Sequence, residues 1–180
     1  MSNRGQAISF TVASLILLFL LNTAYPTLWR HGYRLAFGYL CVLVVISLAT
    51  TIFAWRSPPA RSGAQPQPAR MNFTWIVVIE AAALGAGNSY ILDNHYDSVW
   101  MVPWSAFVVG AHFLIMMWSY RRAIYGGIAA AILAGTAVGA VAGASGYRHG
   151  MVATVLTVLF TTLTAALLVA YSRTPRGSTA

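Results

Sequence analysis

The sequence predicts an all-α integral membrane protein: a single domain forming a polytopic bundle of six transmembrane helices, with both termini in the cytoplasm. Hydrophobic residues make up 58% of the 180 residues and charged residues only 8%, which leaves too little polar surface for a water-soluble domain of this length. Apolar runs of about 18 to 25 residues recur along the chain, which is the length that crosses a hydrocarbon core of about 30 Å. The arginines lie at the ends of these runs rather than inside them.

The predicted spans follow one another with short connections and one longer loop. We place them at 7–25, 35–55, 72–92, 102–120, 123–147 and 151–171. The first span is expected to be retained rather than cleaved as a signal peptide, because of its length and its polar exit at 22–26. The loop 56–71 contains four prolines together with Ser, Gly and Gln, so it is expected to be a solvated linker on the cytoplasmic side.

The distribution of arginine predicts the orientation in the membrane. With six spans, eight of the eleven basic residues lie on the side of the two termini, and cytoplasmic segments retain basic residues. The predicted location is therefore the bacterial cytoplasmic (inner) membrane, with the lipid bilayer as the main partner. Because the basic residues are scattered over several loops, the net charge of +8 does not indicate a nucleic-acid partner.

Several classes of protein are excluded by what the sequence lacks. The single cysteine, Cys41, excludes disulfides and paired-cysteine zinc motifs within one chain. No HExxH helix, phosphate-binding loop, nucleophile elbow or dinucleotide fingerprint is present. No cofactor is therefore expected.

Small residues form a regular ladder in the fifth span. Their positions follow one another at intervals of four: Gly127, Ala131, Gly135, Gly139 and Gly143. Such ladders let two helix backbones approach closely. We expect this face to pack against a neighbouring helix of the same chain. A homodimer or a partner helix docked on the same face is the alternative, and a substrate-lining role is a third.

Two ionisable residues, Glu80 and His112, lie well inside the third and fourth predicted spans. An ionised acid at the centre of a membrane helix costs about 2.5 to 3.5 kcal/mol, so such residues usually face the bundle interior and are functional. Each lies eight residues from the cytoplasmic end of its span, at a depth of about 12 Å, and the two spans are antiparallel. The two side chains are therefore expected to meet, with Asn88 and Ser105 as further polar candidates. The alternative is a structural role for both residues, with a protonated, hydrogen-bonded acid and a neutral histidine.

The external loop between these spans carries Asp93, His95 and Asp97. Aspartate and histidine together can bind a divalent metal, but alternate positions in an irregular loop are a weak indication of a site. We therefore expect no metal, and we expect the acids to pair with Arg30, Arg34 or Arg148 instead.

Glu80, the Gly87–Asn88 pair and the segment Val-Val-Gly-x-His-Phe at 108–113 form a pattern of their own. This pattern resembles one in a group of small uncharacterised bacterial multi-pass membrane proteins, over roughly residues 72 to 140 of this chain. The resemblance implies a shared architecture and points again to Glu80, Asn88 and His112. It implies no activity.

Three hypotheses for the function follow from these residues. The leading one is proton-linked transport or permeation of a small molecule or ion, in which Glu80 titrates and His112 tunes or relays its proton. The second is a membrane-embedded enzyme in which Glu80 and His112 act as general acid and base on a lipid-soluble substrate. The third is a non-catalytic assembly or accessory protein that uses the small-residue face of the fifth span.

Overall fold

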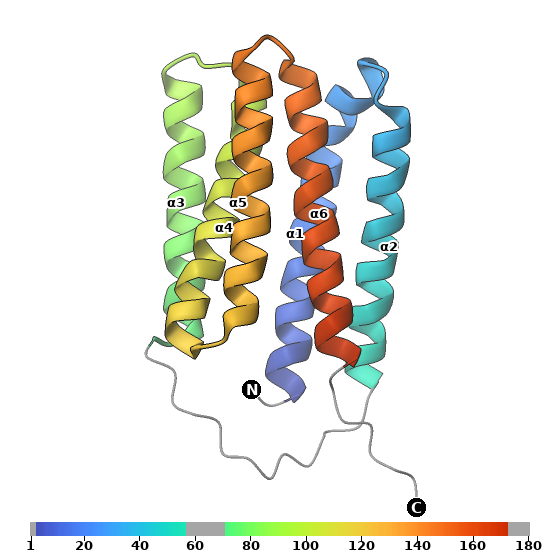
Figure 1. Ribbon diagram of the computed structural model, residues 1–180, viewed down its shortest axis with the longest axis vertical. Coiled ribbons are helices and arrows are strands. Elements are labelled where there is room, and N and C mark those ends of the chain that lie inside the picture. The colour runs from blue at the N-terminus through green and yellow to red at the C-terminus, as the bar shows by residue number, and fades with distance from the viewer. Residues whose placement is uncertain (1–2, 57–70, 173–180) are drawn as a thin grey trace, which may run out of the picture. The chain divides into compact units, whose positions relative to one another are not determined.

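The computed structural model describes residues 3–56 and 71–172, and all regular structure in these residues is helical. The predicted all-helical fold is therefore confirmed for the described residues, whereas most of the predicted linker lies outside them. The elements are α1 (Asn3–Arg30), α2 (Arg34–Arg56), α3 (Phe73–Asp93), the short 3₁₀ helix η1 (Ser98–Trp100), α4 (Met101–Tyr120), α5 (Ala123–Ala144) and α6 (Arg148–Ser172) (Figure 1).

Each helix overlaps one predicted span, with differences at the ends. α1 continues beyond Pro26 to Arg30, although the prediction ended the span at residue 25. A proline removes only one helical hydrogen bond, so a helix with other support can continue through it. α5 ends at Ala144 instead of 147, because the chain turns at Gly146. Among residues 3–56 and 71–172, five helical segments are long and apolar enough, by length and composition, to cross a membrane: α2, α3, α4 together with η1, α5 and α6.

The chain divides into two compact units, 1–66 with 163–180, and 67–162. α6 runs through the boundary between them. In the first unit α1 packs against α2. In the second unit α3 packs against α4, and α4 against α5.

A chain of three buried hydroxyl groups joins α1 to α2. Ser14 Oγ lies 2.7 Å from Ser47 Oγ and 3.0 Å from Thr51 Oγ1. Thr51 donates its own hydroxyl proton to the carbonyl oxygen of Ser47, at 3.0 Å. Since each hydroxyl has one proton to donate, Ser14 donates to Thr51 and Ser47 donates to Ser14. All three protons are then used, and the two helices are hydrogen-bonded to each other well inside their length.

The glycines of α5 bring its backbone close to α6. A Cβ atom added to Gly135 would lie 2.7 Å from the Cβ of Val158, and Gly139 and Gly143 face Val155 and Met151 of α6. The predicted close packing of this face against a neighbouring helix is thus confirmed for three of its glycines. Gly127 is the exception, since nothing lies within 4 Å of the position of its Cβ. Its assignment to the packing face was wrong, since the position of its Cβ faces open space.

Helices α1, α3 and α5 end in the same backbone motif. In each, the second residue after the helix takes the left-handed conformation: Gly32 with φ +83°, His95 with φ +57° and Gly146 with φ +94°. The next residue is a tyrosine whose N–H donates to the carbonyl oxygen five residues earlier: Tyr33 to Leu28, Tyr96 to Ile91 and Tyr147 to Ala142. This is the Schellman motif, in which glycine is the preferred left-handed residue. The three turns therefore share one construction, and only the turn after α3 lacks the glycine.

Candidate functional site

Glu80 and His112 meet across the seam between α3 and α4. Oε2 of Glu80 lies 2.8 Å from Nδ1 of His112, within ion-pair distance. Both side chains are largely buried, with 12% of Glu80 and 10% of His112 exposed. The contact predicted from their matched depth on antiparallel helices is therefore present. It brings a carboxyl group and an imidazole together within two apolar helices.

The geometry of this contact is that of an ion pair rather than of an aligned hydrogen bond. Nδ1 of His112 is a buried nitrogen without a hydrogen-bond partner, even though the carboxylate oxygen lies close to it. Nδ1 and Oε2 are therefore close enough for a hydrogen bond, but they are not aligned for one. Hydrogen bonds weaken steeply when the donor does not point at the acceptor. A small rotation of either side chain would align the two groups or separate them.

Aromatic rings bracket the imidazole of His112. The ring of Phe73, from the first turn of α3, stands edge-on to it with centroids 6.4 Å apart. The ring of Phe113, the next residue on α4, also stands edge-on at 5.5 Å. Phe113 in turn stacks on Tyr125 of α5 at 6.3 Å. The pair thus lies among aromatic rings that come from three helices.

Trp104 covers the same seam at the other end of α3. Its indole N–H donates to the carbonyl oxygen of Ala83 at 3.3 Å. The ring lies against Gly87, where a Cβ atom would overlap it. Gly87 therefore allows Trp104 to lie directly on the backbone of α3, about two turns beyond Glu80.

Ser119 fastens the two helices at the end of the seam where α3 begins and α4 ends. Its hydroxyl accepts a hydrogen bond from the N–H of Met71 at 3.0 Å and lies 3.2 Å from the carbonyl oxygen of the same residue. Because Met71 comes two residues before Phe73, this contact holds the start of α3 where Phe73 can reach His112. Ser119 is 2% exposed.

The other predicted polar candidates do not join the pair. Asn88 lies eight residues beyond Glu80 on α3, about 12 Å along the axis, and its Oδ1 is buried without a hydrogen-bond partner. Ser105 lies seven residues before His112 on α4, about 10 Å along the axis. The sequence pattern placed both on the correct helices, but their distance along the axis keeps them from Glu80 and His112.

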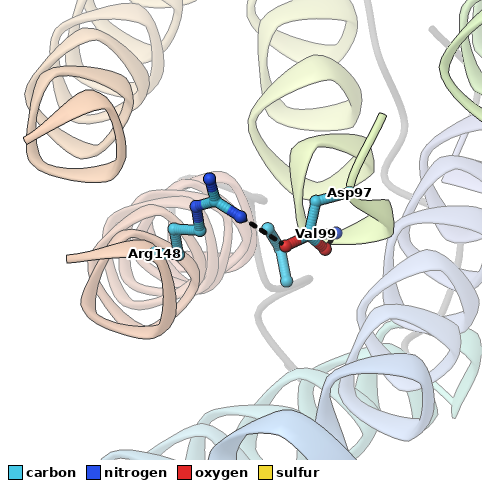
Figure 2. Close-up of polar contacts among 3 residues, drawn as sticks. All are labelled: Asp97, Val99 and Arg148. Carbon is cyan, nitrogen blue, oxygen red and sulfur yellow. Dashed lines mark hydrogen bonds and ion pairs between the residues drawn. The ribbon is translucent and has the colours of Figure 1, made fainter. Parts of the chain in front are cut away.

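Asp97 contributes to structure at the opposite end of this unit. One carboxylate oxygen accepts a hydrogen bond from the N–H of Val99 at 3.1 Å, and this caps η1. The other oxygen lies 3.2 Å from Nη1 of Arg148, at the start of α6 (Figure 2). The predicted pairing of an external acid with Arg148 is confirmed for Asp97. In the described ranges 3–56 and 71–172, Asp93, His95 and Asp97 do not form a cluster of three metal-ligating side chains.

Sequence reasoning missed the aromatic neighbours of the pair. Phe73 lies seven residues before Glu80, which is close to two helical turns, so it shares the face of α3 that carries the acid. Phe113 adjoins His112 directly. The helical spacing of Phe73 was the available signal, but one aromatic residue at such a spacing is common in any membrane helix.

Comparisons with family models, curated proteins and solved structures gave no significant match. The resemblance based on Glu80, Gly87, Asn88 and the 108–113 segment therefore stays a prediction. Any function has to be argued from the site itself.

Proposed function

We propose that the protein spans the bacterial cytoplasmic membrane six times, with both termini in the cytoplasm, and carries out proton-linked transport or permeation of a small molecule or ion. Glu80 is the proposed titrating site and His112 its proton partner. The observation that carries the proposal is the 2.8 Å contact between these side chains inside two apolar helices. Ionisable residues at such positions are costly, and they commonly mark ion and proton pathways.

The chemistry of the pair suits proton coupling. A carboxylate and an imidazole in contact share protons as one coupled unit, so the charge of each depends on that of the other. With one shared proton the pair is either a neutral acid beside a neutral imidazole or a carboxylate beside an imidazolium. A second proton gives a net positive charge, and removal of the proton gives a net negative charge. The net charge of Glu80 and His112 together therefore depends on how many protons they bind.

The poor alignment of the contact also supports this role. A structural pair locked by an aligned hydrogen bond would resist exchange, whereas the Nδ1 of His112 has no hydrogen-bond partner to lose. The remaining exposure of 10% and 12% leaves the two side chains partly accessible. Both features favour a pair whose proton can leave and return.

Proton flux into proteoliposomes tests the proposal. The full-length protein is reconstituted with a pH-sensitive dye inside the vesicles, and a potassium diffusion potential drives proton entry. We expect the protein to conduct protons and Glu80→Gln to remove this flux, because the amide keeps the shape but cannot ionise. Asp97→Asn is the matched control, since it removes an acid that pairs with Arg148 outside the Glu80 site. Equal flux through wild type and Glu80→Gln would contradict the proposal.

A further inference from the structure

We propose that the Glu80 site binds an apolar organic cation, such as a substituted ammonium or phosphonium ion with aromatic or aliphatic groups. This inference rests on the proposed function in that it names the substrate class of the same site. The charge of the site, the ligands it offers and the rings around it support this substrate class.

The charge of the site favours a cation. The chain has three acidic residues, and only Glu80 lies away from the helix ends, since Asp93 is the last residue of α3 and Asp97 precedes η1. The described arginines of the same unit, Arg121, Arg122 and Arg148, lie at or next to helix ends, far along the helices from Glu80. An anionic substrate would therefore meet a carboxylate with no basic group other than His112.

The ligands of the site do not suit a metal ion. Calcium and magnesium require several oxygen ligands arranged around one point. Glu80 has a histidine nitrogen and aromatic rings as its described neighbours, and no second carboxylate joins it. The carbonyl oxygens of the surrounding helices are engaged in helical hydrogen bonds. An organic cation needs only one carboxylate and an apolar surface, and this site has both.

The imidazole of His112 occupies the position beside the carboxylate that a substrate cation would take. When His112 carries two ring protons it is a cation 2.8 Å from the carboxylate, and its ring lies beside Phe73 and Phe113. The two rings stand roughly perpendicular to the imidazole and surround it with apolar surface. A substrate cation that approached Glu80 would meet the same carboxylate and the same two rings. It would take the place of the imidazolium.

Proton and substrate would then compete for one carboxylate. As the substrate binds Glu80, His112 loses its partner and releases its extra proton, and no hydrogen bond of Nδ1 has to break. The titratable groups linked to the pair through ring contacts are Tyr125 of α5, by way of Phe113, and then Tyr120 of α4. Both carry neutral phenols near pH 7, so competition rests on Glu80 and His112.

Binding of tetraphenylphosphonium to the purified full-length protein tests the inference. Titration calorimetry in detergent should show binding that is weaker at acidic pH and is accompanied by proton release. Tetraphenylborate has the same shape and the opposite charge, so it serves as the control ligand and should not compete. Glu80→Gln should weaken binding by about tenfold or more, because this substitution removes the one nearby charge. Glu80→Asp, which keeps the carboxylate, should retain measurable binding and so guards against a general loss of folding.

Two leucine substitutions on α4 test the role of the rings. Phe113→Leu should weaken tetraphenylphosphonium binding by about two- to fivefold, because it reduces the apolar surface beside the carboxylate. Phe107→Leu is the matched control, because Phe107 stacks on Trp104 and is 48% exposed. Equal effects of the two substitutions would overturn the aromatic part of the inference. Equal binding to wild type and Glu80→Gln, or equal binding of tetraphenylborate, would overturn it as a whole.

The failure of this inference can be separated from the failure of the proposed function. Glu80-dependent proton flux without tetraphenylphosphonium binding would overturn the substrate class and leave proton transport standing. Glu80-dependent binding without proton release or proton flux would overturn the proton linkage and leave a cation-binding site.

Discussion

The indole of Trp104 lies directly on the backbone of α3 at Gly87, where any side chain would overlap the ring. The same indole donates to the carbonyl oxygen of Ala83, so Trp104 joins α4 to α3 through packing and a hydrogen bond. This contact and the Glu80–His112 pair lie along one seam. The position of the acid relative to the imidazole therefore depends on a glycine two turns away.

Gly87→Ala is expected to lower the free energy of unfolding by about 1 to 3 kcal/mol, because the added methyl group displaces Trp104. Thermal unfolding in detergent measures this effect. Gly85→Ala is the matched control on the same helix, since nothing lies within 4 Å of its Cβ position. It should be neutral or raise stability by up to about 1 kcal/mol through helix propensity. The same loss in both variants would contradict the contact.

Gly139→Ala should destabilise the packing of α5 against α6, again by about 1 to 3 kcal/mol. Its Cβ would meet the side chain of Val155 and would lie 3.4 Å from the carbonyl oxygen of Met151. Gly127→Ala, on the same helix but facing open space, should leave the melting temperature unchanged or raise it. A melting temperature that falls equally in both variants would show that α6 does not contact Gly139 as described.

Thr51→Val should weaken the α1–α2 contact by about 0.6 to 1.7 kcal/mol, the range of hydrogen bonds between membrane helices. It removes the hydroxyl that Ser14 bonds and keeps the size of the side chain. Thr50→Val is the control, because the Thr50 hydroxyl donates only to Ile46 in its own helix. Chemical unfolding in mixed micelles would compare the two variants. A larger loss for Thr50→Val would contradict the hydroxyl chain.

His95→Gly should raise stability by about 1 kcal/mol, since His95 has a φ of +57° that glycine adopts without cost. His149→Gly is the control of opposite sign, because residue 149, the second residue of α6, does not have a positive φ and glycine there only adds backbone freedom to the unfolded chain. Melting temperatures of both variants should be measured with and without added zinc. If His95→Gly were destabilising only in the presence of zinc, His95 would be a metal ligand rather than a strained turn residue.

The proposed topology predicts which side of the membrane each loop faces. With Cys41 replaced by serine, a cysteine introduced at Ala64 should be labelled by an impermeant maleimide only after the cytoplasm is opened. A cysteine at Ser98 should be labelled in intact cells. Reversed labelling would invert the orientation, and labelling of both from one side would contradict a membrane crossing by α3 between the two positions, and with it the six-span count.

The sequence was sufficient to predict the helices and the meeting of Glu80 with His112. Apolar length defines a membrane helix, and equal depth on consecutive antiparallel helices brings two positions to one level. The misaligned ion pair and the edge-on rings of Phe73 and Phe113 could not be predicted, because they depend on rotamers and on the rotation of each helix about its axis. The open space at Gly127 could not be predicted either, because four-residue spacing does not show which positions of a helix face a neighbour reaches.

The unequal burial of α3 and α4 has a consequence for motion. Ile76 is the only residue of α3 among its described side chains that is fully buried, whereas α4 has seven buried residues and lies between α3 and α5. His112 thus lies on α4, which has more buried residues, and Glu80 lies on α3, which has fewer. Amide hydrogen exchange should be faster along α3 than along α4. A shift of α3 would change the distance between Glu80 and His112, and it would also displace the contacts that α3 makes with Trp104 and that Met71 makes with Ser119.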